Sequence, residues 1–142
     1  MKISVGCCGL AGLSLSSYGE KFKVVELQST FYKLPNPSTA ERWRRNTSQD
    51  FCFTVKSFQG VTHPLSSPTW KRAGIQKPKE RLESYGHLKP THENFECWDR
   101  TMEICRILNS RACVVQLPPS FKCTDENVMN ITDFFSSVSK PE

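Results

Sequence analysis

The fold of this chain is constrained most by a regular alternation between short β-branched runs and segments that carry helix signals. The runs expected to form strands are residues 3–5, 23–28, 51–56 and 112–117. Helices are expected at residues 14–22 and 36–45, from Thr91 or Asn94 to about Leu108, and from Thr124 onward. Neighbouring parallel strands need a helical crossover between them. The alternation therefore predicts an α/β fold with a parallel sheet, and the apolar strands predict burial on both faces.

Two stretches between these elements lack a periodic pattern and are expected to be loops. Residues 29–35 are rich in aromatic side chains, and residues 57–92 contain four prolines and three glycines. A structureless stretch as long as 57–92 is uncommon in a compact domain and is usually functional or disordered.

The length and the N-terminus narrow the class of protein. A chain of 142 residues makes about one domain, so residues 1–142 are expected to form a single unit. No apolar run approaches the ~20 residues that a membrane span needs. The first residues hold one lysine and then a run too short for a signal peptide. The expected protein is soluble and cytoplasmic, with no membrane partner.

The positive charge is concentrated in one part of the chain. The net charge is +5, but the window from Arg42 to Arg81 alone carries nine basic and two acidic residues. Such a stretch attracts phosphates or acidic surfaces by long-range steering, although a solvated surface is an equally ordinary explanation. The partners it suggests are a phosphate-bearing small molecule or a nucleic acid.

The seven cysteines do not form a recognisable metal or redox motif. No two have C-x-x-C spacing, so a zinc ribbon or a thioredoxin motif has no support, and no metal-ligand set is predicted. Cys52 and Cys113 lie in apolar runs and are expected in the core. Cys7 and Cys8 follow the first run at a glycine-rich turn, where a thiolate, metal or redox role stays open. The sequence names no cofactor.

Polar residues stand at the C-terminal ends of the second and third expected strands, where parallel sheets carry their functional groups. Glu26 and Gln28 share one side of their strand, and Lys56 ends the next strand and is placed to pair with Glu26. One interpretation is a purely structural buried ion pair. The other makes Glu26 a general base or metal ligand and Lys56 an anchor for an anion.

Other side chains are expected near the same strand ends. His63 follows in the next loop and joins the predicted catalytic set, although a lone histidine is often only a hydrogen-bonded loop residue. Gln28 and Gln116 are expected to bind substrate. The aromatic residues nearby form either a stacking platform for a base or sugar or a hydrophobic lid. They are Phe31, Tyr32, Phe58 and Trp70.

Several blocks of the sequence resemble the YecE-like family, the family of unknown function numbered seventy-two. They are Val5–Gly9, Phe22–Pro35, Thr39–Trp43, Phe53–Lys56, Thr62–Pro64 and Val115–Phe121. The resemblance covers nearly the whole chain, is weakest at 70–93, and is closer in style to archaeal than to bacterial members. It implies a TIM-barrel-like fold and a polar set at Glu26, Gln28, Lys56, His63 and Gln116. In the first turn, Cys7 and Cys8 replace the family's hydroxyl residues, which puts a hydroxyl role there in doubt.

The resemblance also implies a barrel longer than this chain. A (βα)₈ barrel typically takes ~250 residues, whereas this chain supplies about four βα units. Three hypotheses follow. The first is an enzyme, a hydrolase or lyase acting on a phosphate-bearing or nucleic-acid-related substrate. The second is a non-catalytic nucleic-acid-binding module. The third is a half-barrel completed by a second copy or by a partner chain, because open strand edges favour association.

Overall fold

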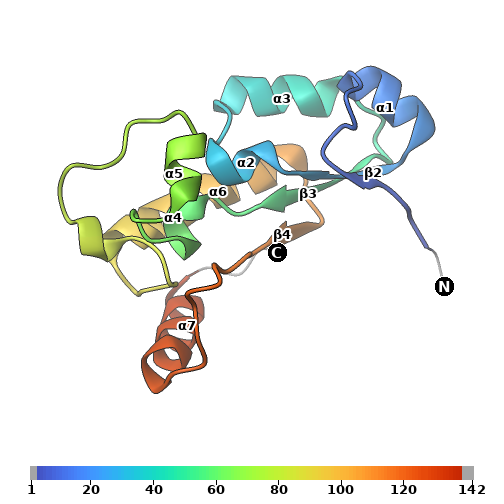
Figure 1. The fold of residues 1–142 in the computed structure, drawn as a ribbon. Coiled ribbons are helices and arrows are strands. Elements are labelled where there is room, and N and C mark those ends of the chain that lie inside the picture. Colours follow the sequence, from blue (N-terminus) through green and yellow to red (C-terminus); the bar gives the residue numbers. More distant parts are fainter. Residues whose placement is uncertain (1–2, 139–142) are drawn as a thin grey trace.

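Four parallel strands form the sheet in the computed structural model, which describes residues 3–138 (Figure 1). They are β1 (Cys7–Cys8), β2 (Val24–Leu27), β3 (Cys52–Lys56) and β4 (Ala112–Val114), and they lie in that order. Each strand is parallel to its neighbour, and Glu26 lies between Cys8 on one side and Thr54 on the other. The predicted α/β fold with parallel strands and four βα units is confirmed.

The helices begin where the sequence signals them. Ser14, Thr91 and Thr124 each cap a helix by accepting a hydrogen bond from a backbone N–H of its first turn. The four longer helices are α1 (Leu15–Lys21), α3 (Pro37–Arg45), α6 (His92–Leu108) and α7 (Asp125–Ser137). Asn36 precedes α3 without a side-chain cap bond, and Pro37 opens that helix, where a missing N–H costs nothing.

One face of the sheet is buried under helices and the other is not. Val25, Leu27, Phe53 and Val55 belong to a core that α1, α3 and α6 cover from one side, and α7 packs on α6 through Phe134 (Figure 1). Burial alternates along β2 and β3, and the residues between these four are only half-buried. The expectation of burial on both faces is therefore wrong for the described residues, in which the helices lie on one side of the sheet.

The first strand differs from the prediction. Residues 3–5 are not a strand, and the Ile3 and Val5 side chains are 73% and 70% exposed. Strand pairing begins at Cys7, in the expected turn, because Gly6 comes so close to β2 that an added Cβ would lie 2.0 Å from the Val24 carbonyl oxygen. The buried Tyr18 hydroxyl ties the two strands: it accepts from the Cys7 N–H at 2.7 Å and donates to the Val24 carbonyl at 2.9 Å.

The two expected loops contain short helices. Residues 29–35 hold α2 (Ser29–Tyr32), and residues 57–92 hold α4 (Gln59–Thr62), α5 (Pro68–Arg72) and the 3₁₀ turn η1 (Leu82–Ser84). Helices of three to five residues are too short to show an apolar period, which is why the pattern missed them. Pro68 opens α5 rather than breaking it.

Buried hydrogen bonds to the Asn94 side chain of α6 hold the end of the 57–92 segment in place. The Asn94 side chain accepts from the N–H of Gly86 and donates to the carbonyls of Gly86 and Lys89, each at 3.0 Å.

Among residues 3–138 no helix has the length and apolar character needed to cross a membrane.

Candidate functional site

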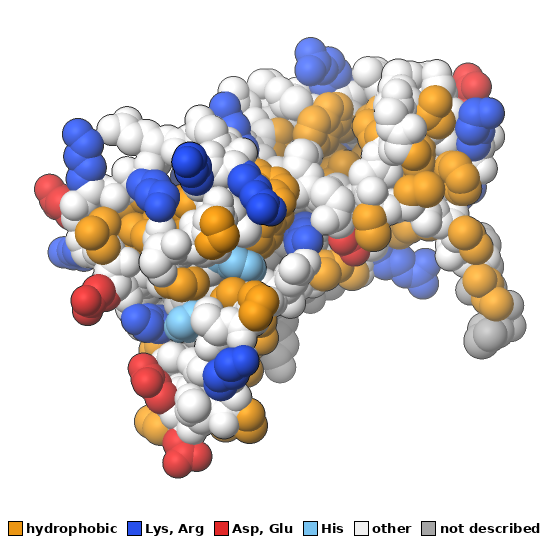
Figure 2. Space-filling view, viewed as in Figure 1, with side chains coloured by type: hydrophobic (Ala, Val, Ile, Leu, Met, Phe, Trp, Pro, Cys, Tyr) orange, Lys and Arg blue, Asp and Glu red, His pale blue; other side chains and the backbone are white. Residues whose placement is uncertain are grey.

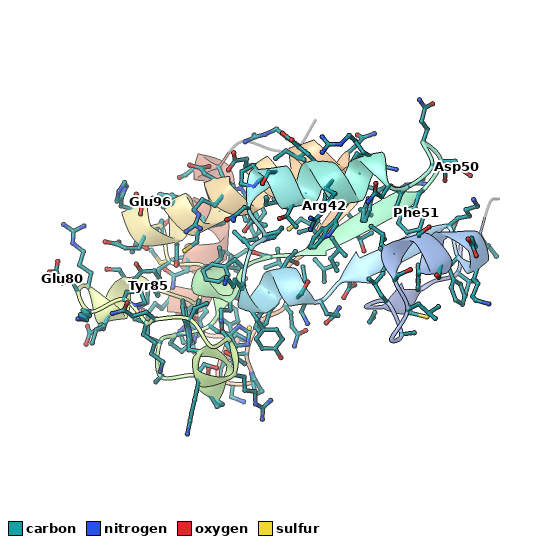
Figure 3. The ribbon with its side chains drawn as sticks, turned by 90° about the horizontal axis from the view of Figure 1, so that it is seen from above. Arg42, Asp50, Phe51, Glu80, Tyr85 and Glu96 are labelled. Carbon is teal, nitrogen blue, oxygen red and sulfur yellow. The ribbon has the colours of Figure 1, made fainter. Side chains whose placement is uncertain are left out.

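The C-terminal ends of the strands point toward one end of the molecule. Figure 3 shows Tyr85 and Glu80 at that end, and Asp50 and Phe51, which precede β3, at the opposite end. Helices α2, α4 and α5 follow the strands there. The predicted polar set therefore lies where parallel α/β folds carry their ligands.

Lys56, Gln28 and Glu26 form a hydrogen-bonded relay at this edge. The Lys56 ammonium donates to Gln28 Oε1 at 3.1 Å, and Gln28 Nε2 donates to Glu26 Oε1. The expected direct pair between Lys56 and Glu26 is not among the ion pairs of residues 3–138, all of which involve other residues. The Gln28 amide stands between the two charges, and both charged groups are half-buried.

The Phe31 ring contacts both Lys56 and His63. The Lys56 Nζ lies 5.0 Å from the centroid of the Phe31 ring, a cation–π distance. The His63 ring meets the Phe31 ring edge-on, with centroids 4.8 Å apart. Phe31 on α2 thus contacts both Lys56 at the end of β3 and His63 in the segment after α4.

His63 is buried and held in its neutral form. Its side chain is 4% exposed, and its Nδ1 shares a 2.8 Å hydrogen bond with the Thr62 hydroxyl. Burial lowers the pKa of His63 to about 4, with smaller contributions from the charges of Lys56 and His87. The imidazole is neutral at pH 7 and nearly closed to solvent.

Thr30 fixes α2 against the end of β3. Its buried hydroxyl lies 2.7 Å from the carbonyl oxygens of both Leu27 and Lys56. The hydroxyl thereby holds the backbone of Lys56 beside the helix that carries Phe31. The sequence prediction missed this role, and its signal is the threonine three residues after the end of β2, immediately before the aromatic pair Phe31 and Tyr32.

The predicted aromatic residues are mostly enclosed. Trp70 is 2% exposed, packs edge-on against Phe58 and Tyr85, and donates its indole N–H to the His63 carbonyl at 3.2 Å. Phe31 is also buried, whereas Tyr32 is half-buried with its ring edge-on to Phe31. Only Tyr32 and Phe58 therefore keep part of their surface open to a ligand.

The remaining predicted residues lie outside the relay. Gln116 is exposed on the segment after β4, and no hydrogen bond of the described residues joins its side chain to Lys56 or Gln28. Cys8 is exposed and sits beside Glu26 in the sheet, while Cys7 is half-buried. Across residues 3–138 no three His, Cys, Asp or Glu side chains gather in a group that could hold a metal ion.

Gln59 is a further buried polar residue near the site that the sequence prediction missed. It opens α4, is fully buried, and donates its Nε2 to the Tyr32 carbonyl at 3.4 Å. Its Oε1 has no hydrogen-bond partner among the described residues. The bond links the helix after β3 to the helix after β2.

The sequence and the fold match known proteins of one kind. A family model described as "Protein of unknown function DUF72" matches residues 10–141. The UPF0759 protein YunF of Bacillus subtilis (strain 168) is 30% identical over 115 residues, which is 80% of this chain and 35% of YunF. The UPF0759 protein YecE of Escherichia coli (strain K12) is 40% identical over 50 residues, or 35% of this chain and 18% of YecE.

A solved structure shows the same fold. A DUF72 family protein from Enterococcus faecalis V583 aligns with a TM-score of 0.53 at 20% sequence identity, over 84% of this chain and 41% of that one. This chain spans well under half the length of these proteins. The predicted YecE-like membership is confirmed, and the family model covers nearly all of the sequence. The chain belongs to the DUF72 family of proteins of unknown function.

Proposed function

We propose that the strand-end site binds a phosphate-bearing ligand through Lys56 and acts on it as a hydrolase or lyase. The observation that carries this proposal is the state of the Lys56 ammonium. It is half-buried, oriented by the Gln28 amide and the Phe31 ring, and without a carboxylate partner within 4.0 Å among residues 3–138. An oriented cation of this kind is an anchor for an anion.

The neighbouring carboxylate supplies a base. One oxygen of Glu26 accepts from Gln28, which leaves the other free to take a proton from water or from the substrate. In a hydrolysis, the water oxygen attacks phosphorus and one of its protons passes to Glu26, while the bond from phosphorus to the ester oxygen breaks and that oxygen takes a proton from solvent water. Lys56 balances the negative charge that the phosphoryl oxygens develop.

His63 acts in this proposal as a support. Its low pKa and 4% exposure leave it neither the proton nor the access that a general acid needs at pH 7. Its ring packs edge-on against Phe31, and Phe31 in turn contacts Lys56. His63 is therefore a positioning residue.

Calorimetric titration with inorganic phosphate, nucleotides and sugar phosphates tests the site. We expect Lys56→Gln to weaken phosphate binding about tenfold or more, because a charge-assisted hydrogen bond contributes about 1.5–3 kcal/mol. Glu26→Gln should retain binding and lose turnover. Lys21→Gln, an exposed lysine on α1, is the matched control and should change neither. Unchanged binding in Lys56→Gln would reject the proposal.

A second candidate role comes from the uncovered face of the sheet. Half-buried and exposed side chains on this face, together with free strand edges, favour association. We propose a homodimer, or a pairing with another barrel half, that closes the barrel and completes the Lys56 site. Light scattering should then give more than the mass of one chain, and a well-behaved monomer at high concentration would contradict it.

A further inference from the structure

A cleft lies next to the segment that follows His63. It has a volume of about 610 Å³, and Pro64, the residue after His63, forms part of its wall. His87, which also lines the cleft, is close enough to lower the pKa of His63. The cleft therefore lies beside His63, whose buried ring contacts Phe31 and, through Phe31, Lys56 of the strand-end site. Its lining also includes Lys77, Pro78, Leu82, Glu83, Tyr85 and Lys89.

Two lysines with fixed ammonium groups stand in this wall. Lys77 donates to the Leu65 carbonyl at 2.6 Å, and Lys89 donates to the Glu83 carbonyl at 2.7 Å. The ion pairs of residues 3–138 include neither lysine. Each ammonium has three N–H donors and uses one of them in its hydrogen bond to a carbonyl. Two oriented cations remain for an anion, against the single Glu83 carboxylate.

The rest of the wall is apolar. Leu82 is 53% exposed, although a leucine of this size is normally covered, and Pro78 and Tyr85 stand with it. A ligand that matches the cleft carries an anionic group for the lysines and a flat apolar part for Leu82 and Tyr85. A nucleotide unit, with its phosphate and its base, has both parts.

Further cations continue beyond the cleft. Figure 2 shows Lys and Arg side chains gathered over α5 and the segment that follows it. Lys71 and Arg72 on α5 and Lys79 in that segment are exposed. Lys79 directly follows Pro78 of the cleft wall, so positive charge continues along the chain beyond the cleft. A ligand with several phosphates fits this surface better than one with a single phosphate.

We propose that this cleft binds one nucleotide of a single-stranded nucleic acid whose neighbouring phosphate lies at Lys56. The inference rests on the proposed phosphate site and names its substrate class. A single strand is required because the bases of a duplex are stacked on one another and do not reach an apolar wall.

Fluorescence anisotropy of a labelled oligothymidylate of about 8 nucleotides, titrated at several salt concentrations, tests this assignment. For single strands, log K falls with log salt by about 0.7 per phosphate contact. We expect the double variant Lys77→Gln/Lys89→Gln to reduce this slope by about 1.4. Lys77→Arg/Lys89→Arg keeps both charges and should restore the slope, which separates lost charge from a loosened loop.

The control variant removes the same charge elsewhere. Lys21 and Arg106 are exposed near the C-terminal ends of α1 and α6, at the opposite edge of the sheet, so Lys21→Gln/Arg106→Gln should leave the slope unchanged. An equal slope in Lys77→Gln/Lys89→Gln and in this control would overturn the inference. So would equal affinity for a duplex or for polyglutamate, because charge alone would then explain binding.

A sugar phosphate, which has no base for the apolar wall of the cleft, distinguishes the two proposals. We expect Lys56→Gln to weaken its binding and Lys77→Gln/Lys89→Gln to leave it unchanged. If this result holds while the oligonucleotide slope does not move, the cleft assignment fails and the Lys56 site stands. If Lys56→Gln binds the sugar phosphate normally, the Lys56 site fails, and the two-site ligand fails with it.

Discussion

The two faces of the sheet contrast sharply, although they are made by alternate residues of the same strands. On the helix-covered face, Val25, Phe53 and Val55 are fully buried. On the uncovered face, Glu26 and Thr54 are half-buried and polar. The first face supplies most of the apolar burial that stabilises the fold. The uncovered face carries the polar and charged side chains of the candidate site.

This difference separates stability from function along one strand. Phe53, Val55 and Ser57 point toward the helices, and Thr54 and Lys56 point away from them. A one-residue shift of register would bury Lys56 and expose Phe53, so the core that holds the fold also fixes where the ammonium lies. Substitutions on the two faces should therefore have separate effects.

The largest effect is expected for Phe53→Ala. The side chain is fully buried, packs edge-on against Phe51 at 4.9 Å, and lies 5.1 Å beneath the Arg44 guanidinium. We expect the free energy of unfolding to fall by about 3–5 kcal/mol, measured by urea denaturation. Cys52→Ala, one residue earlier and on the uncovered face, is the control and should cost less than about 1 kcal/mol. Equal costs would remove the contrast.

His63 predicts a pH dependence of stability. Its pKa is about 4 in the folded protein against an ordinary 6.5, so the unfolded chain binds the proton more readily. Stability is complete above pH 6.5 and falls as the pH drops toward 4, by about 3 kcal/mol at most. Urea denaturation across this range should show the loss, and His63→Gln should flatten it.

Lys56 extends this test to the uncovered face. Its charge is the second cause of the low His63 pKa, after burial. In Lys56→Gln the pKa of His63, followed by NMR titration of the ring protons, should rise toward its ordinary value. An unmoved pKa would mean that the field of the ammonium does not reach through Phe31.

The sequence predicted the parallel order and the longer helices, because strand runs and caps are local signals. Asn36 with Pro37, Thr91 and Thr124 each mark a helix start that the structure has. The pattern could not give the pairing of β1, because the strand is two residues long and its start depends on the close approach of Gly6 to Val24. Nor could it tell that the helices cover one face only, since apolar strands suit either case.

The sequence predicted which polar residues stand at the strand ends, but not how their side chains are connected. Glu26, Gln28 and Lys56 follow from strand alternation and the strand-end rule, and the structure brings them together. That an amide separates the two charges depends on side-chain rotamers, which no spacing encodes. Trp70 and His63 were expected in contact with ligand, yet tertiary packing closes both, to 2% and 4% exposure.

The smallest effect is expected for Thr54→Val. The substitution is compared with Val55→Thr at the next residue, on the opposite face of the sheet. The Thr54 hydroxyl makes one long hydrogen bond, 3.3 Å to the Val25 carbonyl, on the half-buried face, so its loss should change stability by about 0.5 kcal/mol or less. Val55→Thr places a hydroxyl among buried apolar groups and should cost about 1–3 kcal/mol. Urea denaturation of dilute protein measures both. If Thr54→Val costs as much stability as Val55→Thr, the uncovered face of the sheet is packed in solution, because only a buried hydroxyl changes stability that much.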